Sequence, residues 1–99
     1  MTAQIGDRCG AIQSANKEEV RLFGFGTFEG HKVPPLEAGG MAAGLHHAGY
    51  KNPCIKLDSG EEVFGCECWW APEDEIKETI GDRRVVNVSI VEARKEQLA

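Results

Sequence analysis

The chain has little of what nucleic-acid binders, membrane proteins and secreted proteins require. Only 11 Lys and Arg face 16 Asp and Glu, which gives a net charge of −5 at pH 7. That balance disfavours nucleic acid, because phosphate binding needs clustered basic residues. The sequence also lacks an apolar stretch of membrane-spanning length and the basic-then-apolar start of a signal peptide. We therefore expect a cytoplasmic protein that binds no DNA, RNA or membrane.

Signatures of common enzyme classes are missing as well. There is no phosphate-binding loop, no serine elbow and no pair of carboxylates at helical spacing. The four cysteines are expected to be free thiols in the cytoplasm. Cys66 and Cys68 would lie about 6.7 Å apart on a strand, whereas two sulfurs on one zinc approach to about 3.8 Å. The sequence thus predicts no catalytic residue, metal or cofactor, and a thiol- or zinc-dependent enzyme is kept only as a third alternative.

At 99 residues, the chain is predicted to form a single domain spanning residues 1–99. Alternating apolar and polar residues between glycine-rich turns predict five short strands. These strands cover residues 5–14, 19–28, 54–57, 63–70 and 84–91. The third and fourth are expected to form a hairpin that turns at residues 58–60.

Two segments are predicted to be helical. Residues 72–80 begin with Pro72 and three acidic residues, which suit a helix start, and Gly81 suits its end. Residues 36–48 are the second candidate, although each interior glycine costs about 1 kcal/mol relative to alanine. Together the elements predict a mainly β, α+β fold, a small five-stranded antiparallel SH3-like barrel or roll. The opening Ile5-Gly-Asp-Arg-Cys-Gly-Ala-Ile resembles the first strand of KOW-type SH3-like barrels, whose RNA-binding members carry basic residues absent from this chain.

Two glycines at alternate positions, Gly24 and Gly26, leave a bare track along the second predicted strand, with Phe25 and Phe28 at its rim. Glycine weakens a strand, so such a track needs a reason. One explanation is internal, because a neighbouring side chain packs on the glycines or the strand bends sharply there. The other is that an outside ligand or partner lies on the track.

The richest segment is residues 61–70, which hold two cysteines and both tryptophans. If the segment is extended, alternate side chains share a face. The core face would carry Phe64, Cys66, Cys68 and Trp70. Glu67 and Trp69 would face the other way, and an exposed aromatic beside a carboxylate is typical of a recognition patch. The alternative is that Trp69 covers the glycine track or residues 36–49.

The order of several motifs has a family likeness across most of the chain. It contains Gly-Asp-Arg, Leu-Phe-Gly-Phe-Gly-Thr-Phe-Glu-Gly, Lys-Leu-Asp-Ser-Gly and Gly-Cys-Glu-Cys-Trp-Trp-Ala-Pro-Glu. This order resembles small uncharacterised proteins of bacteriophages and prophages. The resemblance implies an accessory protein that binds a host protein or sequesters a small molecule.

The sequence therefore predicts a non-enzymatic binding module. Its site would combine the glycine track, the Glu67 and Trp69 pair, and a flap carrying His46 and His47. A host protein would add a strand or loop to an exposed sheet edge. The alternative partner is a nucleotide-like small molecule, stacked on an aromatic ring and assisted by Arg83 or Arg84. A homodimer is expected from the exposed edges.

Overall fold

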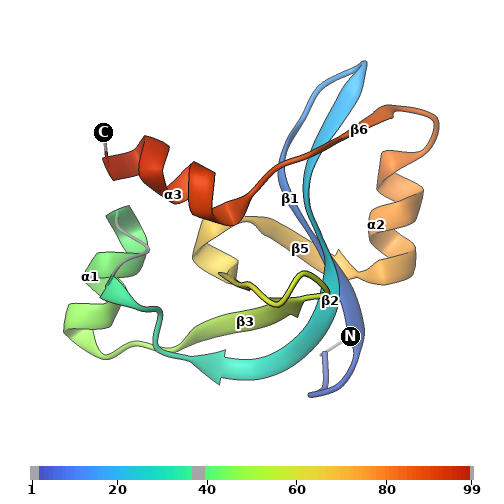
Figure 1. The fold of residues 1–99 in the computed structure, drawn as a ribbon. Coiled ribbons are helices and arrows are strands. Elements are labelled where there is room, and N and C mark those ends of the chain that lie inside the picture. Colours follow the sequence, from blue (N-terminus) through green and yellow to red (C-terminus); the bar gives the residue numbers. More distant parts are fainter. Residues whose placement is uncertain (1–2, 37–39, 99) are drawn as a thin grey trace.

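The computed structural model describes residues 3–36 and 40–98. It contains a six-stranded sheet with helices packed around it (Figure 1). The elements in chain order are β1 (Arg8–Ala15), β2 (Glu19–Lys32), α1 (Gly40–Ala48), β3 (Asn52–Leu57), β4 (Glu62–Phe64), the 3₁₀ turn η2 (Gly65–Glu67), β5 (Trp69–Pro72), α2 (Glu73–Ile80), β6 (Arg84–Asn87) and α3 (Ile90–Leu98). None of the described helices is both long and apolar enough to cross a membrane.

The strands follow the order β4-β3-β2-β1-β5, with antiparallel neighbours throughout. The sixth strand, β6, runs parallel to the first residues of β2, where Glu19 faces Arg84 and Leu22 faces Asn87. Across the described strands the sheet is not closed, because no pairing joins β4 to β5. The mainly β, α+β class predicted from the sequence is thus confirmed, in an open sheet.

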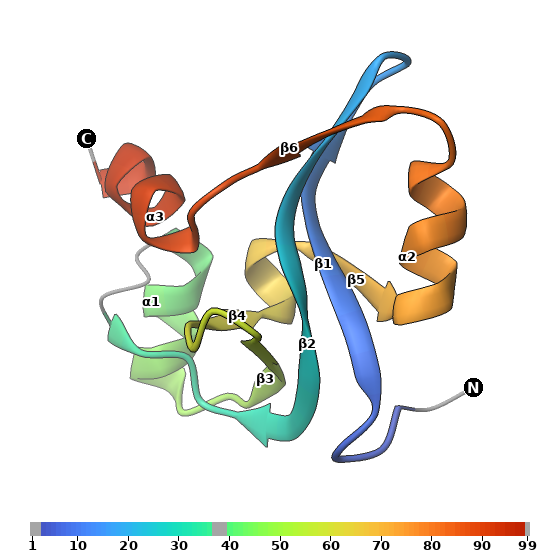
Figure 2. The same ribbon diagram turned by 45° about the vertical axis from the view of Figure 1, so that its right-hand side comes forward.

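β2 is the long, curved strand that connects the two halves of the sheet (Figure 2). Its first half pairs with β1 and β6, and its second half pairs with β3. Phe23 is an extra residue between two paired positions, since Ala11 faces Gly24 and Ile12 faces Leu22. This bulge explains why a glycine is needed at position 24, whose φ of +144° suits no other residue.

Two apolar clusters fill the two faces of the sheet. The first is centred on β1, β2, β3 and α3, and its buried members include Cys9, Ala11, Phe28, Ile55, Val63 and Ile90. The second lies beneath α2 and is made of Ile12, Val20, Leu22, Ile76 and Ile80. α2 and α3 therefore cover different parts of the sheet, and Figure 2 shows α1 and α2 on opposite sides of it.

Several predicted elements are confirmed with small shifts in their ends. The connection between the first two strands, the hairpin of β3 and β4, and the helix α2 all lie close to where the sequence placed them. Pro72 precedes the first residue of α2, and Gly81 follows its last residue with a φ of +55°. The candidate helix at residues 36–48 is helical over Gly40–Ala48, while its residues 37–39 lie outside the described residues.

Two predicted strands are wrong in part. The strand expected at residues 63–70 is interrupted by η2, which divides it into β4 and β5 and raises the strand number from five to six. The strand expected at residues 84–91 ends at Asn87, and α3 begins at Ile90. There the Ser89 hydroxyl accepts a hydrogen bond from the Glu92 amide at 3.3 Å, as a helix-capping residue does.

Candidate functional site

The outer edge of β5 is the first feature that marks a binding site. β5 is the last strand in the sheet order, and its four residues pair with β1 from Cys9 opposite Pro72 to Ile12 opposite Trp69. In the described part of the chain, no strand pairs with its other edge. Such an edge presents unpaired backbone N–H and C=O groups to an incoming strand.

A groove of about 760 Å³ lies beside β5. All four residues of β5 line it, together with Glu75 of α2, residues of the segment before β1, and the first two residues of β1, Arg8 and Cys9. Neighbouring residues on a strand point to opposite faces. The groove therefore includes residues from both faces of β5, and it continues onto the start of β1. We call this feature the β5 groove.

The two tryptophans of β5 differ in their burial, although both line the groove. The Trp70 ring stacks on Phe28 with ring centroids 5.4 Å apart and an interplanar angle of 7°, and it packs against the first apolar cluster. Trp69 keeps 54% of its surface exposed. The expectation that Trp69 is the outward-facing indole is confirmed, and its ring forms part of the groove wall.

Glu67, in contrast, does not accompany Trp69 on an outer face. Its carboxylate accepts hydrogen bonds from Nε and Nη2 of Arg94, both at 2.8 Å, and from the Phe64 amide at 3.1 Å. The Glu67 side chain is only 5% exposed and that of Arg94 18%. The predicted face pairing was wrong because η2 turns Glu67 toward α3, whose Arg94 is 27 residues away in the sequence.

The residues of the predicted glycine track do not share one surface in the structure. Gly24 and Phe25 line a smaller groove of about 390 Å³, together with residues of β3, α2 and β6. Gly26 is buried against β3, where an added Cβ would overlap the Lys56 carbonyl oxygen and lie 2.7 Å from the Leu57 Cα. Phe28 is buried beneath Trp70. Close packing and bending within the sheet therefore account for both glycines.

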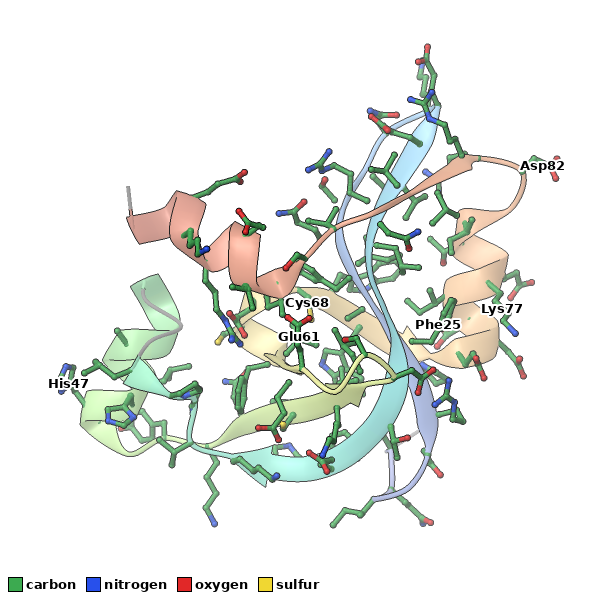
Figure 3. The ribbon with its side chains drawn as sticks, in the orientation of Figure 1. Phe25, His47, Glu61, Cys68, Lys77 and Asp82 are labelled. Atoms are coloured by element: carbon green, nitrogen blue, oxygen red, sulfur yellow. The ribbon has the colours of Figure 1, made fainter. Side chains whose placement is uncertain are left out.

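The two histidines lie apart from either groove. Their rings contact each other edge to face on α1, with centroids 5.8 Å apart. Nδ1 of His46 lies 2.9 Å from the Pro34 carbonyl oxygen. Figure 3 places His47 at the outer end of the molecule, on the far side from Phe25 and Lys77. The structure thus does not bring the predicted flap to the glycine track or to Trp69.

All four thiols are free and held in their protonated form. Burial is the main cause in each case. It raises the pKa of Cys9 to about 11 and that of Cys54 and Cys68 to about 12. The pKa of Cys66 is also raised, by burial and then by the nearby Glu67 charge. A nucleophilic cysteine needs the opposite shift, so this arrangement does not activate any of the four.

The four thiols should differ in their rates of alkylation. We expect iodoacetamide to modify Cys66 first near neutral pH, because it is partly exposed, whereas Cys9 and Cys54 are fully buried. Labelling of the latter two should follow global unfolding. Mass spectrometry of peptides after timed quenching measures each rate. Fast labelling of Cys54 in the folded protein, at the rate found in urea, would contradict the burial described.

A mixed cluster of potential metal ligands occurs where β2, β3 and β4 meet. Ligand atoms of Glu29, Cys54 and Glu62 lie within 4.8 Å of one another. The Cys54 thiol donates to Glu62 at 3.3 Å. The Lys32 ammonium lies 3.3 Å from Glu29 and 3.2 Å from Glu62, so a resident cation already balances the carboxylates. The arrangement is that of an ion-pair network.

Sequence reasoning missed this cluster for an identifiable reason. Cys54 and Glu62 are diagonal neighbours across the β3–β4 hairpin, since Cys54 faces Phe64 and Lys56 faces Glu62. The hairpin register could have revealed that pair. Glu29 joins through a second irregularity in β2, between residues 28 and 31, and the sequence gives no signal of its position.

Comparisons with protein-family models, with curated proteins and with solved structures found no match. Function is therefore inferred from the geometry of the site. The β5 groove is the largest of the described grooves, and it alone combines an exposed aromatic ring with an open strand edge. Those features suit the binding of an extended polypeptide.

Proposed function

We propose that this protein is a non-enzymatic binding module that holds an extended segment of a partner protein along the outer edge of β5. The exposed Trp69 indole on the wall of the β5 groove is the observation that carries the proposal. Tryptophan is enriched among the residues that dominate binding energies at protein interfaces. An indole left in water on a strand edge therefore favours recognition over packing.

The dimensions of the groove agree with a short peptide. The four residues of β5 extend over about 13 Å, at about 3.3 Å per residue. A strand of four or five residues would match that length and continue the ladder that β1 and β5 begin. The groove volume of about 760 Å³ lies within the range of specific binding sites, about 300–1,000 Å³. Main-chain hydrogen bonds would supply affinity, and Trp69 would supply selectivity.

The wider biological setting is part of the same proposal. The resemblance to small phage and prophage proteins supports an accessory role in which the partner is a host protein in the cytoplasm. The sharply curved β2 and the short strands around it support a relation to SH3-like barrels. A homodimer remains part of the proposal, since an open strand edge can pair with a second copy.

The nucleotide alternative has less support. The Arg83 guanidinium donates to the backbone carbonyls of Asn16 at 2.9 Å and Ile80 at 3.4 Å. The Arg84 side chain contacts Glu19 at 3.3 Å. Neither arginine lines the β5 groove, so a phosphate beside Trp69 would find no basic partner among them. A polypeptide partner needs no such charge.

Trp69→Ala is expected to weaken peptide binding by at least about thirtyfold, since truncation of such an anchor costs about 2 kcal/mol or more. A library of random displayed peptides, selected on the wild-type protein, supplies the ligands. Affinities of the selected peptides for both proteins are then compared by fluorescence anisotropy.

Tyr50→Ala is the matched control, because Tyr50 is an exposed aromatic residue, 66% accessible, outside the β5 groove. It should bind the selected peptides as the wild type does. Equal affinity of every selected peptide for the wild type and for Trp69→Ala would refute the proposal.

A further inference from the structure

The β5 groove has an excess of acidic groups around its exposed indole. Asp7 and Glu75 line it. Glu75 belongs to the first turn of α2, where Glu73 and Asp74 precede it. The three carboxylates in this first turn carry more negative charge than the helix dipole balances, because the dipole is equivalent to about half a positive charge at the N-terminus.

Among the described residues that line the groove, the one basic residue, Arg8, is already paired. Nη1 and Nη2 of Arg8 donate to the two carboxylate oxygens of Asp58 at 2.7 and 2.8 Å. Nη2 of Arg8 also lies 3.6 Å from Glu73. This bidentate pairing with Asp58 raises the pKa of Arg8. Arg8 therefore forms its ion pairs with Asp58 and Glu73. Among the described residues, it forms none with Asp7 or Glu75.

Glu75 is the groove acid whose carboxylate has no partner among the described residues, since that of Asp7 accepts a hydrogen bond from the Gln4 amide at 2.9 Å. Glu73 is shared between Arg8 and Lys77, whose ammonium lies 3.8 Å from it. Within the described residues Glu75 takes part in no ion pair, and its side chain is exposed at the groove. An exposed indole and an uncompensated carboxylate thus occupy the wall of one groove. Indole rings are the best aromatic partners for Lys and Arg.

We propose that the β5 groove selects a cationic side chain, Arg or Lys, on the extended partner segment, with the charged end at Glu75 and the rest of the side chain against the Trp69 ring. This inference rests on the proposed function and names the chemistry of the partner. The overall charge of −5 acts in the same direction, because complementary charge speeds encounter and disfavours acidic partners.

Two peptides that differ only in charge test the inference. The probes are acetyl-Val-Thr-Arg-Thr-Val-amide and its twin with citrulline in place of arginine, which keeps the shape and removes the charge. Each is titrated into ¹⁵N-labelled protein, and the shift of the Trp69 indole N–H signal gives the affinity. We expect the arginine peptide to bind about fivefold more tightly, the scale of a partly exposed charge pair with a cation–π contact.

Glu75→Gln should reduce the affinity of the arginine peptide to that of the citrulline peptide. Glu78→Gln is the matched control, since Glu78 is exposed on the same helix but does not line the groove. It should leave the difference between the two peptides unchanged. Added salt should diminish the arginine advantage in the wild type.

The outcomes separate the two proposals. If both peptides shift the Trp69 signal with equal affinity, or if Glu75→Gln leaves the arginine advantage intact, the charge selection is refuted while the binding module stands. If neither peptide shifts the Trp69 signal and library-selected peptides bind Trp69→Ala as they bind the wild type, both proposals are refuted.

Discussion

Gly26→Ala is expected to lower the free energy of unfolding by about 3 kcal/mol or more, at the upper end of overpacking effects. An alanine Cβ would overlap the Lys56 carbonyl oxygen and lie 2.7 Å from the Leu57 Cα. Both obstacles are backbone atoms of β3, so no side-chain rotation relieves the overlap. Relief requires β2 and β3 to separate where Gly26 faces Leu57, at the centre of the sheet. Urea unfolding followed by tryptophan fluorescence measures the loss.

Gly44→Ala is the matched control for that substitution. Gly44 lies within α1, and a Cβ there would meet no atom within 4 Å. Alanine is the better helix former by about 1 kcal/mol, so this variant should keep or gain stability. If Gly26→Ala unfolded at the same urea concentration as the wild type, the close approach of β2 and β3 would be wrong.

Arg94→Met is expected to lower the free energy of unfolding by about 3 kcal/mol, because it leaves the nearly buried Glu67 carboxylate without its cation. The lost contacts are the two 2.8 Å hydrogen bonds to Glu67 and a 2.9 Å hydrogen bond from Nη2 to the Glu62 carbonyl. These bonds join α3 to η2 and β4. Their loss should also loosen the C-terminal helix, which hydrogen exchange of its amides would detect.

Two further variants define the cause of that loss. Lys95→Met removes a neighbouring charge on α3 whose ion pair with Glu92 is largely exposed, and it should change stability by less than about 1 kcal/mol. Adding Glu67→Met to Arg94→Met removes the orphaned carboxylate and should recover part of the stability. If Arg94→Met were no more destabilising than Lys95→Met, the Glu67 pair would not hold α3 in place.

Local sequence signals predicted the elements whose partners are close in the chain. The turn at residues 58–60 and the alternation on either side of it define the β3–β4 hairpin. Pro72, the acidic first turn and Gly81 define α2. The outward direction of Trp69 also followed from alternation, because β5 itself is extended.

Elements that depend on distant partners were not predictable. The 3₁₀ turn η2 is supported by Arg94 from the other end of the chain, and it turned Glu67 away from the surface that alternation had assigned to it. The predicted strand at residues 84–91 takes in the first two residues of α3, Ile90 and Val91, because both are β-branched. There the burial of Ile90 and Ala93 against the sheet prevails over local propensity.

The proposed site also has a part that local sequence signals predict and a part that depends on distant segments of the chain. The exposure of Trp69 is a local consequence of strand alternation, whereas much of the remaining wall of the groove comes from the segment before β1, from the start of β1 and from α2. Gly24 and Gly26 form the predicted bare track, yet in the structure Gly24 lies at the bulge of β2 and Gly26 allows the close approach of β2 to β3. From a single sequence, a glycine that leaves room for a ligand looks the same as one that leaves room for a neighbouring strand of the same protein.

The most direct test is amide hydrogen exchange of the protein with and without a selected peptide whose binding depends on Trp69. If the peptide adds a strand, the exchange of outward-facing amides in residues 69–71 should slow on binding, since Pro72 has no N–H. Unchanged exchange in β5, with protection confined to α1 or to the Gly24 groove, would contradict the account.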